Sequence, residues 1–179
     1  MTKLSLLAAA GAAALAISTG ASAQEAATAQ PYVGLSGGYH SLGVLGVNDD
    51  DGAIYGVVAG VDVPVGETLT LGVEGNYHLG TDGIDSEYGV AARLGFPVGN
   101  NGSLLFVKGG YQWVEFDLGN FVPLPGPGPV PAVNDTDSDY IVGVGGEFGL
   151  GDSPVRLRVG VDTIGFDSVR ATAGVVFKF

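Results

Sequence analysis

Hydrophobic and polar residues alternate one by one along the chain from Tyr32 onward, in eight stretches separated by turn-forming residues. Side chains repeat with a period of two in a β-strand and of 3.6 in a helix, so this pattern predicts strands. The clearest stretch is Leu69–Leu79, where Thr70, Glu74 and His78 occupy the polar side. The predicted apolar faces run over Val33–Tyr39, Ala53–Val63, Leu69–Leu79, Tyr88–Val98, Leu105–Trp113, Tyr140–Leu150, Val155–Val161 and Val169–Phe179.

The connections between the predicted strands differ in length from one end to the other. Tight turns are predicted at Pro64–Thr68, Gly99–Gly102 and Gly151–Pro154. Mostly longer loops are predicted at the opposite end, over Ser41–Gly52, Gly80–Ser86 and Gly119–Asp139, with a short one at Ile164–Asp167. Short turns at one end and longer loops at the other are typical of bacterial outer-membrane barrels.

Alternation alone does not say which face points outward, because a soluble eight-stranded barrel has the same period with its apolar face inside. Here the aromatic residues of the apolar face differ in type between the two ends of the predicted strands. Those near the long loops are Tyr39, Tyr55, Tyr77, Tyr88, Tyr111, Trp113 and Tyr140. Those near the tight turns are Phe96, Phe148, Phe177 and Phe179. Two girdles around an aliphatic band favour a bilayer, where such rings prefer the headgroup level.

The basic residues after Lys3 all fall on the other face. They are Arg93, Lys108, Arg156, Arg158, Arg170 and Lys178. That face is also rich in glycine, which suits a narrow lumen filled by long side chains better than a solvated surface. The sequence therefore predicts an all-β fold, an eight-stranded antiparallel transmembrane up-and-down β-barrel over 31–179.

The predicted turns also fix which inward charges face each other across neighbouring strands. The expected pairs are Asp162 with Arg170, Glu147 with Arg158, and Glu74 with Arg93. Together with Lys108, these residues are predicted to form one mid-barrel charge network that plugs the lumen. An ion path along the same charges is the alternative. Asp62 and Lys178 are a candidate for a further pair.

The N-terminus resembles a secretory signal. Lys3 precedes an apolar run from Leu4 to Ile17, and Ala21-Ser22-Ala23 fits a cleavage site. A transmembrane helix is the alternative, but the run is too short. We expect a signal peptide at 1–23, a short segment at 24–30 and the barrel after it. The chain has no cysteine, and removing Lys3 leaves 6 basic against 19 acidic residues, which disfavours nucleic-acid binding.

Several segments resemble the small outer-membrane barrels of the OmpA/OmpX/Opa type. They are the opening Pro31-Tyr32-Val33-Gly34, the run Phe106-Val107-Lys108-Gly109-Gly110-Tyr111, and the ending Gly174-Val175-Val176-Phe177-Lys178-Phe179. The resemblance implies that Glu74, Lys108, Glu147 and Arg158 match the inner Glu/Lys/Glu/Arg cluster of the OmpA membrane domain. It also implies that Phe177 and Phe179 carry the signal read by the barrel-assembly machinery. We expect no counterpart of the peptidoglycan-binding domain of OmpA.

Other chemistry is weakly supported. His40 and His78 both face the lumen, but no third metal ligand is identifiable. An outer-membrane lipid-modifying hydrolase would need a lipid-accessible serine, histidine and acid, and Ser36 faces the lumen. Asp135-Thr136-Asp137-Ser138-Asp139 resembles half of a calcium loop and lacks its glycine. We therefore expect no catalytic, cofactor or metal site.

The predicted outer loops are acidic, and the longest also contains five prolines. The acidic residues assigned to them are Asp49, Asp50, Asp51, Asp82, Asp85, Glu87, Glu115, Asp117, Asp135, Asp137, Asp139 and Asp167. They either serve solubility or bind neighbouring lipopolysaccharide through divalent cations. We expect a non-enzymatic protein with a structural or surface-interaction role, in adhesion or envelope integrity, among outer-membrane lipids and lipopolysaccharide. Its loops would be extracellular and both termini periplasmic. A small porin-like channel is the alternative.

Overall fold

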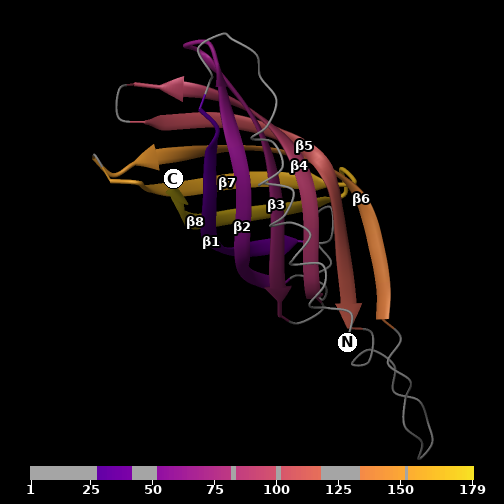
Figure 1. The fold of residues 1–179 in the computed structure, drawn as a ribbon. Coiled ribbons are helices and arrows are strands. Elements are labelled where there is room, and N and C mark those ends of the chain that lie inside the picture. Colours follow the sequence, from indigo (N-terminus) through magenta and orange to yellow (C-terminus); the bar gives the residue numbers. More distant parts are fainter. Residues whose placement is uncertain (1–27, 42–51, 82–83, 100–101, 118–133, 152) are drawn as a thin grey trace, which may run out of the picture.

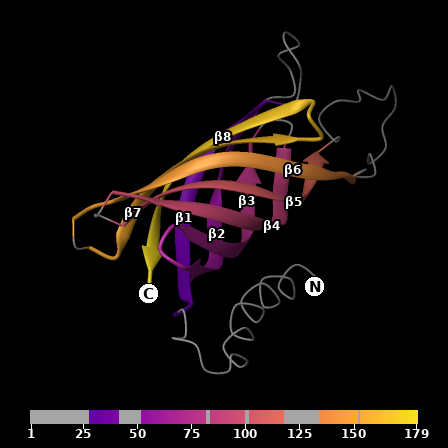
Figure 2. The ribbon, with the colours of Figure 1, turned by 90° about the horizontal axis from the view of Figure 1, so that it is seen from above.

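The computed structural model describes residues 28–41, 52–81, 84–99, 102–117, 134–151 and 153–179. These form eight strands: β1 Gln30–Ser41, β2 Gly52–Val65, β3 Leu69–Gly80, β4 Ile84–Val98, β5 Ser103–Asp117, β6 Asn134–Gly149, β7 Val155–Ile164 and β8 Ser168–Lys178. Each strand pairs antiparallel with the next, and β8 pairs with β1, so the sheet closes into a barrel (Figures 1 and 2). The predicted fold is confirmed. No helix in these ranges is long and apolar enough to cross a membrane.

The two ends of the barrel are named here by their connections. At the short-turn end, 66–68, 99–102 and 150–154 join neighbouring strands, and at the long-loop end the connections are 42–51, 81–83, 118–133 and 165–167. The predicted signal peptide at 1–23 and most of the segment 24–30 lie outside the described residues, as do parts of the loops.

The observed register matches the turns predicted at the β6–β7 and β7–β8 connections. Glu147 faces Arg158, and Asp162 faces Arg170. Across β3 and β4, Glu74 faces Ala91 while Arg93 faces Gly72, so Glu74 and Arg93 are diagonal rather than direct neighbours. Diagonal residues on one face remain within reach of long side chains.

Three strands extend further toward the long-loop end than the alternation predicts. β4 begins at Ile84, β5 ends at Asp117 and β6 begins at Asn134, although the sequence placed a loop over Gly80–Ser86 and another over Gly119–Asp139. A register shift between Ile84 and Ser86 interrupts the period of two in β4. In β6 the outer residues Thr136, Asp137 and Asp139 are all exposed, so no apolar face marks the strand there.

The apolar face points outward, away from the lumen. Leu35 is 68% exposed and Val144 is 57% exposed, as befits side chains that face lipid in a membrane barrel. The inward face is packed closely around glycines. A Cβ added at Gly56 or at Gly110 would collide with the backbone of the neighbouring strand, which explains why no larger residue stands there.

The seven tyrosine and tryptophan residues of the predicted girdle lie on the outward face at the long-loop end. Four of them form one continuous cluster across β4, β5 and β6. The rings of Tyr88 and Trp113 stack at 5.5 Å, Trp113 meets Tyr111 edge-on at 5.0 Å, and Tyr111 meets Tyr140 edge-on at 5.5 Å. Aromatic pairs in these geometries add stability beyond the area that they bury.

Closure of the sheet predicts resistance to detergent. Around the closed barrel every strand pairs with a neighbour on both sides along most of its length, so unfolding has no full-length open edge from which to begin. Unboiled protein in SDS is therefore expected to migrate differently from boiled protein on a gel. Identical migration of the two samples would contradict the closed barrel.

Candidate functional site: the buried charge network

Two glutamates and two arginines form a closed ring at mid-height in the lumen. Arg158 lies 2.5 Å from Glu74 Oε2 through Nη1 and 2.5 Å from Glu147 Oε1 through Nη2. Arg93 makes the same two bridges, at 3.0 Å to Glu74 and 2.7 Å to Glu147. We call Glu74, Arg93, Glu147 and Arg158 the central ring. Because each guanidinium binds both carboxylates, the ring joins strands β3, β4, β6 and β7.

Two aromatic rings hold these guanidiniums in place. The Arg93 guanidinium carbon lies 4.2 Å from the ring centre of Phe106 and 5.0 Å from that of Tyr32. For Arg158 the distances are 5.5 Å and 4.9 Å. The Tyr32 hydroxyl also donates to Glu74 Oε2 at 2.7 Å and contacts Arg93. Cation–π contacts of this kind are strongest where water is excluded. Sequence reasoning assigned neither ring to the network.

Toward the short-turn end, the network continues through Lys178. Its ammonium group lies 2.9 Å from Asp62 Oδ2 and 2.9 Å from Glu147 Oε2. The structure therefore brings Asp62 and Lys178 together, as expected from the sequence, and links this pair to the central ring.

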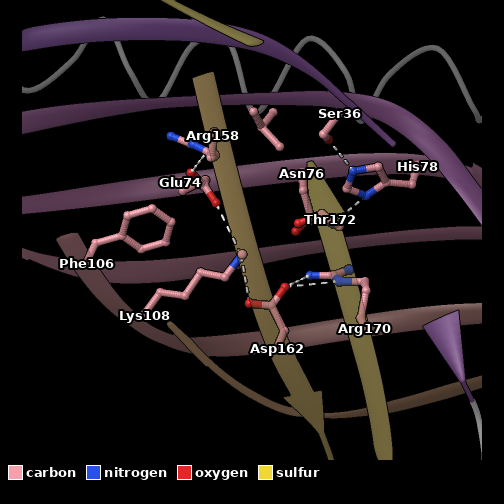
Figure 3. Close-up of a pocket in the computed structure, with 12 residues that line it drawn as sticks. Ser36, Glu74, Asn76, His78, Phe106, Lys108, Arg158, Asp162, Arg170 and Thr172 are labelled. Carbon is pink, nitrogen blue, oxygen red and sulfur yellow. Dashed lines mark hydrogen bonds and ion pairs between the residues drawn. The ribbon is translucent and has the colours of Figure 1, made fainter. Parts of the chain in front are cut away.

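Toward the long-loop end, Lys108 and Asp162 carry the network upward (Figure 3). Lys108 Nζ lies 3.5 Å from Glu74 and 3.1 Å from Asp162. Asp162 in turn binds Arg170 at 2.8 Å. Arg170 is almost completely buried and also contacts Glu87. All seven residues of the predicted network thus lie in one connected set.

Glu87 is a correction to the sequence analysis, which assigned it to an acidic outer loop. It lies in β4 with its side chain 0% exposed, because the strand begins earlier than predicted. Its carboxylate binds His40 Nδ1 at 2.9 Å and lies 3.3 Å from His78 Nδ1. The other ring nitrogens face serines, His40 toward Ser168 at 3.2 Å and His78 toward Ser36 at 2.7 Å. We call these five residues the histidine cluster.

The charges of the network balance. Its acidic members are Asp62, Glu74, Glu87, Glu147 and Asp162, and its basic members are Arg93, Lys108, Arg158, Arg170 and Lys178. Five carboxylates and five cations sum to zero when both histidines are neutral. Buried ions are costly unless they are paired, so this balance allows so many charges to occupy one interior.

A cavity of about 20 Å³ lies between the central ring and the histidine cluster. Glu74, Lys108, Asp162, His78 and Thr172 are among the residues that line it (Figure 3). A space of this size holds about one water molecule, which polar walls would bind. This cavity therefore has room for about one solvent molecule.

The histidine cluster has the bonding order serine, histidine, carboxylate, which is also the order of a hydrolase triad. However, His40 is fully buried and Ser168 nearly so, both inside the lumen. Arg170 also binds the carboxylate of Glu87, and the Ser168 hydroxyl donates to the carbonyl of Ile164. Among the described residues, no group of three or more His, Cys, Asp or Glu side chains is arranged to hold a metal ion.

The chain matches the family model of the outer membrane protein beta-barrel domain over residues 8–179. It belongs to this family. Membership of the outer membrane protein beta-barrel family places the protein in the outer membrane, consistent with its outward apolar face.

Two solved barrels have a similar fold. Neisserial surface protein A is 13% identical with a TM-score of 0.57, and the match covers 87% of this chain and 100% of that one. Ail, the attachment invasion locus protein of Yersinia pestis, is 11% identical with a TM-score of 0.50, covering 84% of this chain and 97% of that one. Comparison with curated proteins gives no significant match. At these identities the likeness concerns the fold of this outer-membrane barrel.

Proposed function

We propose that this protein is a non-enzymatic outer-membrane barrel whose lumen is plugged and whose role is structural or surface-interacting. The long loops would be extracellular, and both chain termini would be periplasmic. The observation that supports a plug is the continuous, charge-neutral network from Asp62 at one end to His40 at the other. Eight strands leave an interior just wide enough for side chains, and here those side chains are bonded to one another.

The closed central ring argues against an open channel. Each arginine is held by two carboxylates and lies near two aromatic rings, so moving one guanidinium breaks several contacts at once. The alternative function, a small porin-like channel, would need these side chains to move aside together. The cavity beside the ring admits about one water rather than a file of hydrated ions.

Planar-bilayer recording tests the plug directly. The wild-type protein is expected to show little or no steady conductance, because the central ring and Lys108 block the lumen at mid-height. A variant with Arg93→Ala and Arg158→Ala, which empties the centre of the ring, serves as the comparison and is expected to conduct more. Long-lived, ion-selective openings of the wild type would support the channel instead.

The proposed surface role concerns the acidic loops. The connecting segments 42–51, 81–83, 118–133 and 165–167 contain no lysine or arginine, while Arg93, Lys108, Arg158, Arg170 and Lys178 are all engaged inside the barrel. Ail has been solved in complex with the heparin analogue sucrose octasulfate, a polyanion. A polyanion would be repelled by the loops of this chain. We therefore propose cationic partners, including divalent cations shared with neighbouring lipopolysaccharide.

Assembly is proposed to use the aromatic residues near the end of β8. Phe177 and Phe179 both remain exposed on the outside of the barrel. The Phe179 backbone N–H donates to the carbonyl of Pro31 at 2.9 Å, next to the seam between β8 and β1. Residues at this seam are well placed for contact with the barrel-assembly machinery while the seam is still open.

A further inference from the structure

Strands β5 and β6 run beyond the turn that joins β7 and β8 (Figure 1). The pairing of β6 with β5 continues outward to Asp117 facing Asn134, whereas its pairing with β7 begins only at Ile141 facing Ile164. Within the described residues, the outer part of β6 therefore has a strand on one side only. This outer segment, 134–140, is called the free edge of β6.

The backbone groups that point toward the free side can be identified from one hydrogen bond. Gly165 N–H donates to the carbonyl of Tyr140 at 2.9 Å, so Tyr140 directs its backbone groups to the side of β7. Backbone groups alternate in direction along a strand, so Ser138 directs its groups to the same side. An N–H left open on such an edge is a template for another strand.

These edge groups are already occupied by the chain itself. Ser138 N–H donates to Asp137 Oδ1 at 2.8 Å, and Tyr140 N–H donates to Asp139 Oδ1 at 2.6 Å. The Ser138 carbonyl accepts from the Tyr111 hydroxyl at 3.4 Å. The Ser138 and Tyr140 donors are thus each taken by the aspartate that precedes them. Asp137 and Asp139 are both exposed, so these carboxylates also place negative charge along the edge.

We propose that Asp137 and Asp139 close the free edge of β6 and prevent two copies of this protein from pairing edge to edge. Two identical edges related by a twofold axis perpendicular to the sheet would pair antiparallel, with Ser138 facing Ser138 and Thr136 of each copy facing Tyr140 of the other. Such pairing needs the Ser138 and Tyr140 N–H groups, which the carboxylates hold. It would also bring four aspartates together. This role uses Asp137 and Asp139 of the motif that resembles half of a calcium loop.

The test compares variants in detergent, where two copies can meet in any orientation. The double variant Asp137→Ala with Asp139→Ala removes the carboxylate acceptors, and Asp137→Asn with Asp139→Asn removes the charge but keeps a side-chain oxygen. A matched control, Glu67→Ala with Asp85→Ala, removes two exposed acidic groups elsewhere on the barrel. Sedimentation equilibrium measures the association constant, and gel migration of unboiled samples confirms that each variant is folded.

The alanine pair is expected to dimerise with an association constant at least about tenfold larger than the wild type, a change of about 1.4 kcal/mol. The asparagine pair, which keeps the acceptors but loses the charge, is expected to associate more weakly than the alanine pair, and the control pair is expected to stay as monomeric as the wild type. Because the chain has no cysteine, Ser138→Cys added to the alanine pair should form a disulfide between copies, since residue 138 faces itself across the axis. The proposal is overturned if the alanine pair stays monomeric, if its dimer gives no such disulfide, or if either other pair dimerises equally.

Discussion

Replacing Glu147 by alanine is expected to lower the free energy of unfolding by about 3–5 kcal/mol, the usual cost of breaking a buried ion pair. Glu147 is fully buried and binds three cations, Arg93, Arg158 and Lys178. Its removal leaves positive charge concentrated at the centre of the lumen. Glu74 is the nearby carboxylate that still binds both arginines, which keeps the loss within this range.

Urea unfolding in lipid vesicles measures this effect. Glu67→Ala is the control, because Glu67 is an exposed acidic residue in the β2–β3 turn, and it is expected to change stability little. A double-mutant cycle with Arg158→Met should give a coupling energy clearly different from zero. A coupling of zero between 147 and 158 would contradict the contact between them.

Exchanging the two charges, with Glu147→Arg and Arg158→Glu, is expected to restore little of the lost stability. The new arginine at 147 would meet Arg93 and Lys178, and the new glutamate at 158 would meet Glu74. Recovery close to the wild type would show that the 147–158 pair acts alone rather than as part of the central ring.

Arg170→Met is the second change with a large expected effect, again about 3–5 kcal/mol. The methionine fills much of the same space but leaves both Glu87 and Asp162 without their arginine. The histidines beside Glu87 and the lysine beside Asp162 offset part of this loss, since each still contacts its carboxylate.

Neutralising the two carboxylates should recover much of that stability. In the triple variant with Arg170→Met, Glu87→Gln and Asp162→Asn, no buried carboxylate is left without its arginine. Lys108 loses Asp162 as a partner in this variant but still pairs with Glu74. Replacing a buried ion network as a whole often changes the free energy of unfolding little, whereas removing one partner from it lowers that free energy strongly. Urea unfolding of the single and triple variants in lipid vesicles measures whether stability is recovered. A triple variant as unstable as Arg170→Met would contradict the ionic origin of the loss.

The fold and most of the network were predictable because each rests on a regular pattern. The period of two gives the strands, and tight turns such as Gly151–Pro154 fix the register that places Glu147 opposite Arg158. The inward placement of the basic residues then requires carboxylates at matching heights. Asp162 and Arg170 follow from the β7–β8 turn by the same reasoning.

The remaining members were missed where the pattern breaks or where it gives no chemical signal. Glu87 shares the inward parity of Arg93, but it precedes the predicted start of the strand at Tyr88 and was therefore assigned to the loop. Tyr32 and Phe106 are inward aromatic residues, and nothing in the sequence indicates that their rings flank guanidiniums from β4 and β7. These contacts cross the lumen, and cross-lumen distances depend on how the closed barrel tilts and narrows.

Every strand contributes at least one residue to the network, and this affects how the barrel folds. Tyr32, Asp62, Glu74, Arg93, Lys108, Glu147, Arg158 and Arg170 come from β1 to β8 in order. Pairing of β1 with β8 joins residues as far apart as Tyr32 and Lys178, so these contacts form late. A slip of one residue in any strand would turn its charge toward lipid. The interior thus makes folding cooperative, because its ion pairs all form only when the barrel is complete and every strand is in the correct register.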